Sequence, residues 1–285
     1  MNKLGCYLRL MRPLNCAMMG FAVLVGATLV RIITSDSFWL NLTFGFLTGF
    51  TLTAASMAIN DYYDRDIDAI NEPKRPIPSG AIKPKEALAF TFFLTAIGLI
   101  TAYLTSISCL ILAIISWAIS VSYTTVGKRS GLPGNFLVAA CVAVPFIYGS
   151  LAVAGTIELN VVIFASMAFL SVTGREITKG IVDVQGDRAQ NVKTLAVRSG
   201  EKTAAHTAVI FFLLAVALSP IPLLLDLVSF WFIPLVAATD IVLAASAFML
   251  LKNYSRENAR KVKNMVLLWF LLGLLAFIVG ALTIN

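Results

Sequence analysis

Two separate groups of acidic side chains have a spacing that suits metal and phosphate chemistry. The first is Asn60-Asp61-Tyr62-Tyr63-Asp64-Arg65-Asp66-Ile67-Asp68. If this segment is helical, Asp66 points away from the other acids, because only side chains three or four residues apart are neighbours. The remaining acids share one stripe with an asparagine: Asn60, Asp61, Asp64 and Asp68. Like charges at this spacing repel, so a cation is needed, and all-oxygen ligands select Mg²⁺ or Ca²⁺ over zinc.

The second group of acids lies in Glu176–Arg188. Asp183 and Asp187 are one helical turn apart, and Lys179 and Glu176 lie one and two turns earlier on the same face. Mg²⁺ prefers one or two carboxylates together with waters and substrate phosphates. Two carboxylate groups with Lys and Arg nearby therefore predict a pair of Mg²⁺ ions that binds a diphosphate.

The composition indicates where these groups must lie. Of 285 residues, 59% are hydrophobic and 13% are charged, and the mean hydropathy is +0.87. A soluble domain has about 25% charged residues, so a water-soluble enzyme is excluded. A net charge of +7 with so few charged residues also excludes a disordered or nucleic-acid-binding chain. The chain is predicted to be a polytopic membrane protein.

Nine stretches have the roughly 20 mainly apolar residues that a membrane-spanning helix needs. They are 13–33, 40–59, 87–105, 107–124, 133–153, 159–178, 203–224, 229–251 and 264–284. With nine spans, every Lys and Arg except Arg31 falls on one side. By the positive-inside rule that side is cytoplasmic, which places the N-terminus inside and the C-terminus outside a cell membrane.

Both groups of acids fall on this cytoplasmic side. One such group would be interpreted as solvated loop or helix-capping residues. Two groups with helical spacing at the same membrane face favour binding of metal and diphosphate instead. A transporter with Asp240 in its ion pathway is the alternative of another class, but transporter sites lie near the midplane of the bilayer. We expect Asp240 to make a structural hydrogen bond, and Gly45 and Gly49 to serve close helix packing.

At these residues the chain resembles the UbiA-type intramembrane prenyltransferases. The segment 60–68 fits the family motif NDxxDxxxD, and 183–187 fits its second motif, DxxGD. Residues 71–80 resemble the family's PxRP loop, and 123–128 resemble its Tyr…Lys element. One departure is Asn191, where many members have Gly. The CDP-alcohol phosphotransferases, a rival membrane class with clustered aspartates, are excluded because their DGxxAR motif is absent.

The resemblance implies an all-α single domain, 1–285, in which nine transmembrane helices surround a central cavity with a cytoplasmic cap. Two Mg²⁺ ions would bridge the motifs and an isoprenyl diphosphate, and an acceptor lipid in the bilayer would receive the prenyl group. The segments 60–80 and 174–200 are most similar to archaeal members that transfer geranylgeranyl to geranylgeranylglycerol phosphate, with an aromatic acceptor as the alternative. The expected metal ligands are Asn60, Asp61, Asp64, Asp68, Asp183 and Asp187.

Catalysis is expected from the same aspartates except Asp61, together with Lys179. Cations beside the motifs are expected to bind phosphate, because they neutralise the charge that develops on a diphosphate leaving group. Anchoring at the membrane surface is the alternative role for such cations. The expected substrate contacts are Arg12, Asn15, Lys74, Arg75, Tyr123, Lys128, Arg129 and Arg188.

Overall fold

The structure, a computed structural model, describes residues 3–30, 36–189 and 191–282, and every regular element in these ranges is a helix. Within the described ranges, eight helices are long and apolar enough to cross a membrane. A ninth span is formed if α1 (Lys3–Met11) and α2 (Pro13–Thr28), which are bent by 46°, are counted together. The all-helical, multi-pass fold is therefore confirmed. The first predicted span, 13–33, corresponds to α2, which ends at Thr28 and reaches the length of a span only together with α1 across the break at Arg12. The predicted residues 31–33 lie outside the described ranges, as do 283 and 284.

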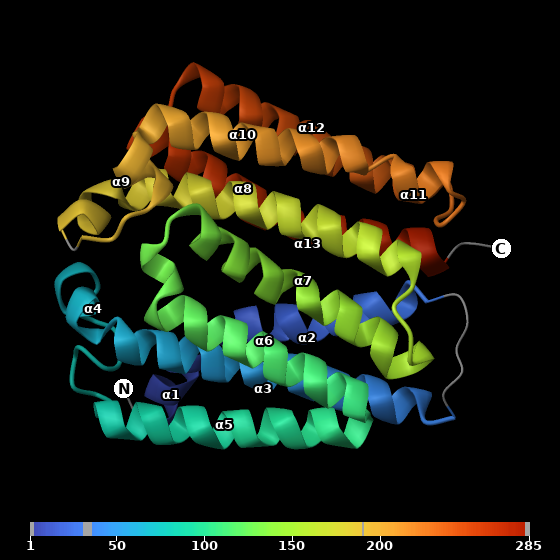
Figure 1. The fold of residues 1–285 in the computed structure, drawn as a ribbon, viewed down its shortest axis with the longest axis horizontal. Coiled ribbons are helices and arrows are strands. Elements are labelled where there is room, and N and C mark those ends of the chain that lie inside the picture. The colour runs from blue at the N-terminus through green and yellow to red at the C-terminus, as the bar shows by residue number, and fades with distance from the viewer. Residues whose placement is uncertain (1–2, 31–35, 190, 283–285) are drawn as a thin grey trace. The chain divides into compact units, whose positions relative to one another are not determined.

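The chain divides into two compact units, which are described separately. The first unit is built around α3 (Phe38–Tyr63), which packs against α5 (Pro84–Thr105) and α6 (Ile107–Thr125) (Figure 1). It also contains α1, most of α2, the short α4 (Arg65–Asn71) and the second half of α7 (Leu132–Ala154). The boundary crosses α7 beside Pro145, where the helix lacks a backbone hydrogen bond.

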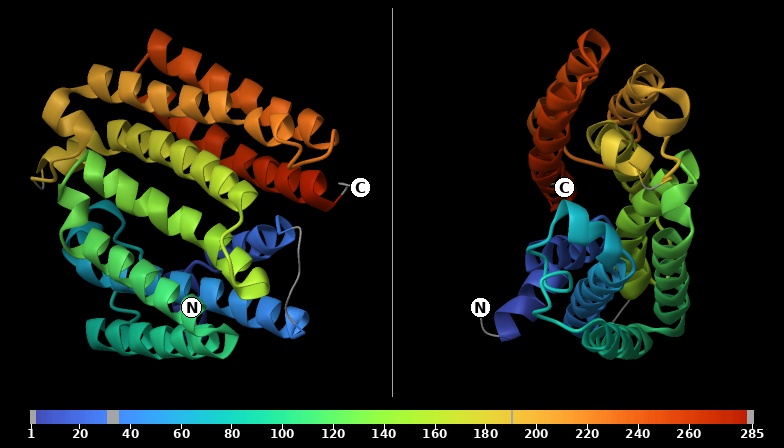
Figure 2. Two further views of the ribbon diagram at one scale, coloured as in Figure 1. Left: turned by 45° about the vertical axis from the view of Figure 1, so that its right-hand side comes forward. Right: turned by 90° about the vertical axis from the view of Figure 1, so that its left-hand side faces the viewer.

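The second unit is built around α8 (Leu159–Ala189), which packs against α10 (Glu201–Leu218) and α13 (Arg256–Leu282) (Figure 2). In the chain, α12 (Phe232–Lys252) comes after α10 and before α13, and it contacts both helices. The remaining elements are short: η1 (Gly127–Arg129), α9 (Leu195–Ser199) and α11 (Ile221–Leu224). One core of mostly small and branched side chains joins α8, α9, α10, α12 and α13.

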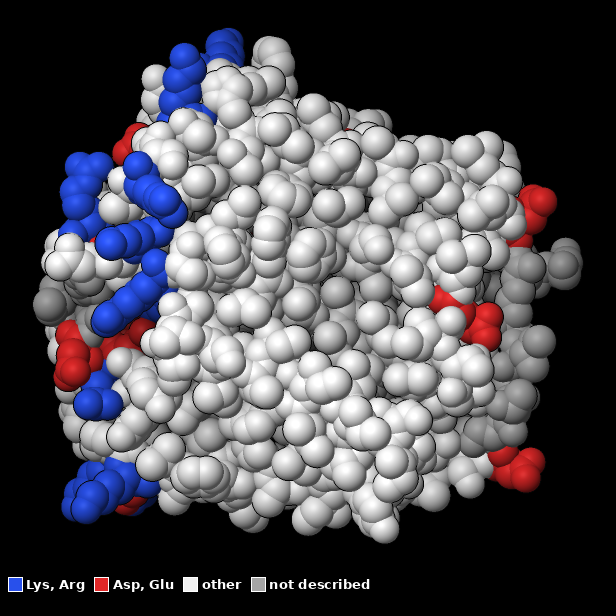
Figure 3. Space-filling view, viewed as in Figure 1, with Lys and Arg blue, Asp and Glu red and all other residues white. Residues whose placement is uncertain are grey.

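Residues without charge cover most of the face drawn in Figure 3. Many large apolar side chains along the helices are exposed, as expected for helices that face lipid. Several polar side chains along the spans are paired inside the protein, which lowers the cost of placing them in an apolar solvent. In α12, Asp240 accepts a hydrogen bond of 2.5 Å from Ser219 Oγ, which confirms the expected hydrogen bond. In the first unit, Tyr148 donates to Thr48 and Thr105.

Glycines allow the helices of the first unit to cross closely. A Cβ on Gly45 would lie 2.9 Å from Val23, and one on Gly49 would lie 3.0 Å from the carbonyl oxygen of Met19 in α2. The expected packing role of these two glycines is confirmed. A Cβ on Gly149 in α7 would meet the backbone of α2 at the carbonyl oxygen of Val23. Backbone cannot give way as a flexible side chain does, so this crossing requires glycine.

This crossing yields a prediction about stability. The change Gly149→Ala should lower the free energy of unfolding by about 3 kcal/mol, the upper part of the usual range for overpacking. The matched control is Gly273→Ala in α13, where the added Cβ would have its nearest neighbour at 3.8 Å. The control should be neutral or stabilising, because Ala is the better helix former. Thermal unfolding in detergent, followed by circular dichroism, measures both. Equal melting temperatures for the two variants would contradict the crossing.

Candidate active site

The first group of acids lies at the junction of α3 and α4. Helix α3 ends at Tyr63 and α4 begins at Arg65, yet the helical hydrogen-bond pattern continues through the junction. The amide of Asp64 donates to the carbonyl of Asn60 at 2.9 Å, and the amide of Asp68 donates to the carbonyl of Asp64 at 2.7 Å. Asn60, Asp64 and Asp68 therefore follow one another at one-turn intervals, as their spacing predicts.

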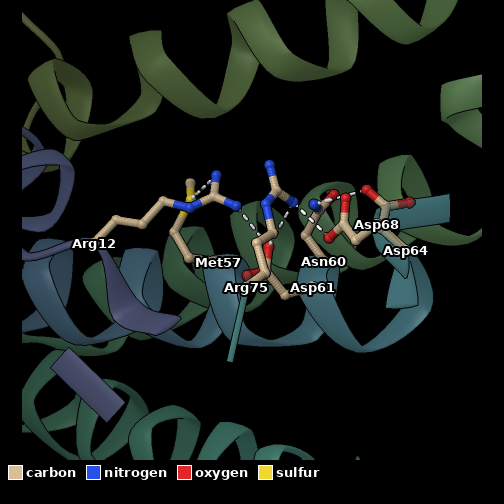
Figure 4. A network of polar contacts seen from close by, with 7 residues as sticks. All are labelled: Arg12, Met57, Asn60, Asp61, Asp64, Asp68 and Arg75. Carbon is tan, nitrogen blue, oxygen red and sulfur yellow. Dashed lines mark hydrogen bonds and ion pairs between the residues drawn. The ribbon is translucent and has the colours of Figure 1, made fainter. Parts of the chain in front are cut away.

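Three carboxylates of this group are buried: Asp61, Asp64 and Asp68 are 2%, 7% and 5% exposed. The side chain of Asp66 is 87% exposed, as the helical spacing predicts. Asn60 Nδ2 donates to Asp64 Oδ2 at 3.0 Å (Figure 4). Burial of several carboxylates is unfavourable without cations, so the nearby guanidinium groups are essential to this arrangement.

Two arginines from outside the helix supply that positive charge (Figure 4). Arg12 Nη2 lies 2.5 Å from Asp61 Oδ1, and Arg12 Nη1 contacts Met57 Sδ at 3.5 Å. Arg75 Nη1 lies 2.5 Å from Asp68 Oδ2 and 3.5 Å from Asp61 Oδ1. Burial disfavours the charge on Arg75, but the carboxylates of Asp61 and Asp68 outweigh it and raise the pKa of the guanidinium above its usual value. Arg75 is therefore permanently charged.

Local sequence explains why Arg12 reaches the motif. The residue before a proline is disfavoured in the helical conformation, so α1 ends at Met11 and α2 begins at Pro13. Arg12, between them, has a φ of 53°, which a residue with a side chain rarely adopts. Its carbonyl oxygen accepts hydrogen bonds from the amides of Asn15 and Cys16, so the break is ordered.

The loop after α4 positions Arg75 in a similar way. The amide of Arg75 donates to the carbonyl of Glu72, and its carbonyl accepts from the amide of Ser79. Two residues further along, Ile77 is buried, and so is Ile82. Both belong to a small apolar cluster that includes residues of α1, α3 and α5: Cys6, Leu10, Ala58 and Ala87. This cluster holds the loop and α1 beside the acidic group.

The second group of acids, at the end of α8, has a different environment. Asp183 is exposed and Asp187 is half-buried. Lys128 of η1 and Lys179, two turns before Asp187, lie within electrostatic reach of Asp187. The amide of Val192 donates to the carbonyl of Asp187, and Asn191 turns the chain with a φ of 55°. Asn tolerates this left-handed conformation, so the departure from the family's Gly is accommodated.

Several other charged residues on α8 and α13 make contacts that the spacing of the second motif does not predict. Arg175 Nη1 lies 2.7 Å from Glu176 Oε1, and Lys179 Nζ lies 3.5 Å from Glu176 Oε2. Lys263 of α13 lies within electrostatic reach of Asp183 and Lys179. Arg256, at the start of α13, donates from Nε to the carbonyl of Val182. In the sequence, only the run of basic residues before the last span could have indicated Arg256 and Lys263.

The other predicted contacts are distributed over both units. In the first unit, Asn15 and Lys74 are exposed and Tyr123 is half-buried in α6. In the second unit, Arg129 and Arg188 are exposed. The roles of these five residues in substrate binding stay predictions.

The donor atoms fit Mg²⁺ better than a transition metal. Among the described residues, no three His, Cys, Asp or Glu side chains are arranged to hold a metal ion as a protein cage. Mg²⁺ takes few protein ligands and completes its shell with waters and phosphate oxygens, so pairs of carboxylates suffice. All the side chains in question offer oxygen, which is the ligand atom that Mg²⁺ prefers.

Known proteins are similar to this chain along nearly its whole length. Digeranylgeranylglyceryl phosphate synthase of Archaeoglobus fulgidus is 38% identical, over 99% of this chain and 98% of the relative. The protein of the same name from Methanosarcina mazei is 36% identical, over 96% of this chain and 97% of the relative.

Solved structures share the fold. A structure of digeranylgeranylglyceryl phosphate synthase has a TM-score of 0.81 and 34% identity, with 99% of both chains covered. A UbiA homologue from Archaeoglobus fulgidus bound to GPP and Mg²⁺ has a TM-score of 0.68 and 19% identity, over 96% of this chain and 99% of that one. The model of the UbiA prenyltransferase family matches residues 19–272. The chain, with its two aspartate motifs, therefore belongs to the UbiA prenyltransferase family.

Proposed function

We propose that this prenyltransferase transfers a geranylgeranyl group from geranylgeranyl diphosphate to geranylgeranylglycerol phosphate, which forms the diether core of archaeal membrane lipids. Full-length similarity to several proteins named digeranylgeranylglyceryl phosphate synthase carries the proposal. The chain covers 98% and 97% of the first two of these relatives. Aromatic acids or quinone precursors are the alternative class of acceptor, and the acceptor test below distinguishes the two classes.

Mg²⁺ is the proposed cofactor, with two ions per site. A UbiA homologue of the same fold was solved with GPP and Mg²⁺, and the oxygen-only donors described above suit that ion. The proposed ligands are Asn60, Asp64 and Asp68 in the first unit and Asp183 and Asp187 in the second. When bound, the ions would neutralise charge on the departing diphosphate.

In the proposed reaction, the bond between C1 of the donor and its diphosphate oxygen breaks, and the diphosphate leaves with the electron pair. The acceptor hydroxyl oxygen attacks C1 and gives up its proton. Arg75, Lys128 and Lys179 would bind phosphate oxygens, since each lies beside a motif acid and carries a positive charge. The apolar helices would exclude water, which would otherwise capture the allylic cation.

The proposed orientation follows from the distribution of basic residues. The N-terminus and both acidic groups would face the cytoplasm, and the C-terminus would lie outside. The diphosphate and the acceptor phosphate would then reach the site from the cytoplasmic side, with their prenyl chains in the bilayer. Basic residues away from the acids, such as Lys252 and Arg260, would anchor that face of the protein to lipid headgroups.

The first functional prediction concerns the metal. The changes Asp64→Asn and Asp183→Asn should each lower turnover by roughly 100-fold or more, because each removes a charged metal ligand. Chelation with EDTA should abolish activity and added Mg²⁺ should restore it. The measurement is the transfer of radiolabelled prenyl groups by detergent-solubilised protein.

The control for this prediction is Asp66→Asn, whose side chain is exposed beside the same motif. This variant should retain most of the activity, since Asp66 lies off the stripe of Asn60, Asp64 and Asp68. A loss as severe as that of Asp64→Asn would show that the assignment of faces is wrong. Full activity of the unmodified enzyme in EDTA would contradict the metal mechanism.

The second functional prediction concerns the acceptor. If the acceptor carries a phosphate, replacing a cation that binds it removes a charge-assisted contact of about 1.5–3 kcal/mol. Lys128→Ala should therefore raise the acceptor's KM roughly 10- to 150-fold, and neutral geranylgeranylglycerol should lose a similar factor with the unmodified enzyme. An assay that offers geranylgeranylglycerol phosphate and 4-hydroxybenzoate in competition determines the chemical class of the acceptor. Faster prenylation of 4-hydroxybenzoate would replace the lipid acceptor by an aromatic one.

A further inference from the structure

We infer that Asp61 is a positioning residue rather than a metal ligand, and that it holds the guanidinium groups of Arg12 and Arg75 ready for the donor diphosphate. This inference rests on the proposed function and replaces the ligand role that the spacing of the motif suggested for Asp61. All the residues involved belong to the first unit, and their contacts are drawn in Figure 4.

The carboxylate of Asp61 already has two cations at one oxygen. Oδ1 lies 2.5 Å from Arg12 Nη2 and 3.5 Å from Arg75 Nη1. A Mg²⁺ ion at the same oxygen would have to approach two guanidinium groups and repel both. Asp61 is 2% exposed, so little water is available to screen that repulsion. Its contacts therefore favour guanidinium over metal as the permanent partner.

The other acids of the motif are arranged differently. Asn60, Asp64 and Asp68 are spaced at four-residue intervals, and the hydrogen bonds from Asp64 N to Asn60 O and from Asp68 N to Asp64 O keep them in line. Asp61 lies beside this line, toward the side of Arg12 (Figure 4). In this motif the line of three supplies the proposed oxygen ligands. Asp68 also contacts one guanidinium, Arg75 Nη1 at 2.5 Å, whereas Asp61 contacts the guanidinium groups of both Arg12 and Arg75.

The backbone at Arg12 indicates that its position serves a purpose. Its φ of 53° is unfavourable for a residue with a side chain, and such strain is maintained when the surrounding contacts require it. Here the break between α1 and α2 brings Arg12 to Asp61 and to Met57 of α3. Without Asp61, the strained conformation would lose the ion pair that it supports.

Both guanidinium groups retain donors for an anion. A guanidinium has five N–H donors, and the described contacts of Arg75 with Asp61 and Asp68 involve only Nη1. The side chains of Arg12 and Arg75 are 34% and 32% exposed, so a ligand can reach them. If Asp68 leaves Arg75 to bind a metal ion, Asp61 still holds Arg75 in place. Two adjacent guanidinium groups then match the several oxygens of a diphosphate.

The experiment compares metal binding with diphosphate binding in the purified full-length protein. Binding of Mn²⁺ in the presence of inorganic pyrophosphate is followed by electron paramagnetic resonance for the unmodified protein, Asp61→Asn and Asp64→Asn. We expect Asp61→Asn to keep the Mn²⁺ affinity within about 2-fold, and Asp64→Asn to weaken it about 10-fold or more. An equal loss in both variants would make Asp61 a ligand and overturn the inference.

A double-mutant cycle tests the coupling between Asp61 and Arg12. Asp61→Asn and Arg12→Ala should each raise the KM for the prenyl diphosphate by roughly tenfold. The double variant should raise it by less than the product of the two single effects, because without Arg12 only the positioning of Arg75 is left for Asp61→Asn to disturb. Independent, multiplied effects would overturn the inference. If Asp61→Asn does not fold, the variants Arg12→Ala and Arg75→Ala test the inference instead. Both should bind pyrophosphate more weakly than the unmodified protein in metal-free calorimetry. Unchanged affinity would overturn the inference.

The controls separate this inference from the proposed function. An unmodified protein that binds no Mn²⁺ with pyrophosphate would contradict the metal proposal and the inference with it. If the unmodified protein binds Mn²⁺ but Asp61→Asn and Asp64→Asn lose affinity equally, only the role of Asp61 is contradicted.

Discussion

The first unit depends on the pairing of buried carboxylates with guanidinium groups that come from elsewhere in the chain. Asp61, Asp64 and Asp68 are nearly inaccessible to water, and burying several carboxylates together is unfavourable unless cations lie beside them. Arg12 reaches them from the α1–α2 break and Arg75 from the loop after α4. Both supporting segments are fixed by the apolar cluster around Leu10 and Ile82. The packing of α1, a short helix, therefore bears directly on the charge balance of the site.

Much of the fold and part of the site could be predicted because they depend on local patterns. Apolar runs of sufficient length predict the spans, and four-residue spacing predicts the line of Asn60, Asp64 and Asp68. The exposure of Asp66 follows from the same geometry. A structural hydrogen bond is predicted for Asp240 because this residue lies about 11 residues, or roughly 16 Å, from the cytoplasmic end of its span. Ser219 provides that bond.

What could not be predicted depends on contacts between distant segments. The sequence places Arg12 before a proline, but it does not show that the helix break directs the side chain at Asp61, 49 residues away. Asp61 is buried and Asp183 is exposed, but the two motifs have similar spacing, so the sequence does not predict this difference. Arg256 and Lys263 belong to a run of basic residues typical of a membrane surface, and only the packing of α13 on α8 brings them near the second motif.

The unequal environments of the two motifs bear on the order in which the proposed metal ions would bind. At the first motif, an ion at Asp68 would have to displace the guanidinium of Arg75, which lies 2.5 Å from the carboxylate, and would have to shed water to enter a buried site. At the second motif, Asp183 is exposed and Asp187 is half-buried, so Mg²⁺, which gives up its waters reluctantly, would bind at Asp183 with more of its hydration shell. The first motif would gain its ion more readily when a diphosphate arrives with it, because the anion would offer Arg75 a new partner in exchange for Asp68. Metal occupancy at the buried motif would then be coupled to substrate more strongly than occupancy at Asp183.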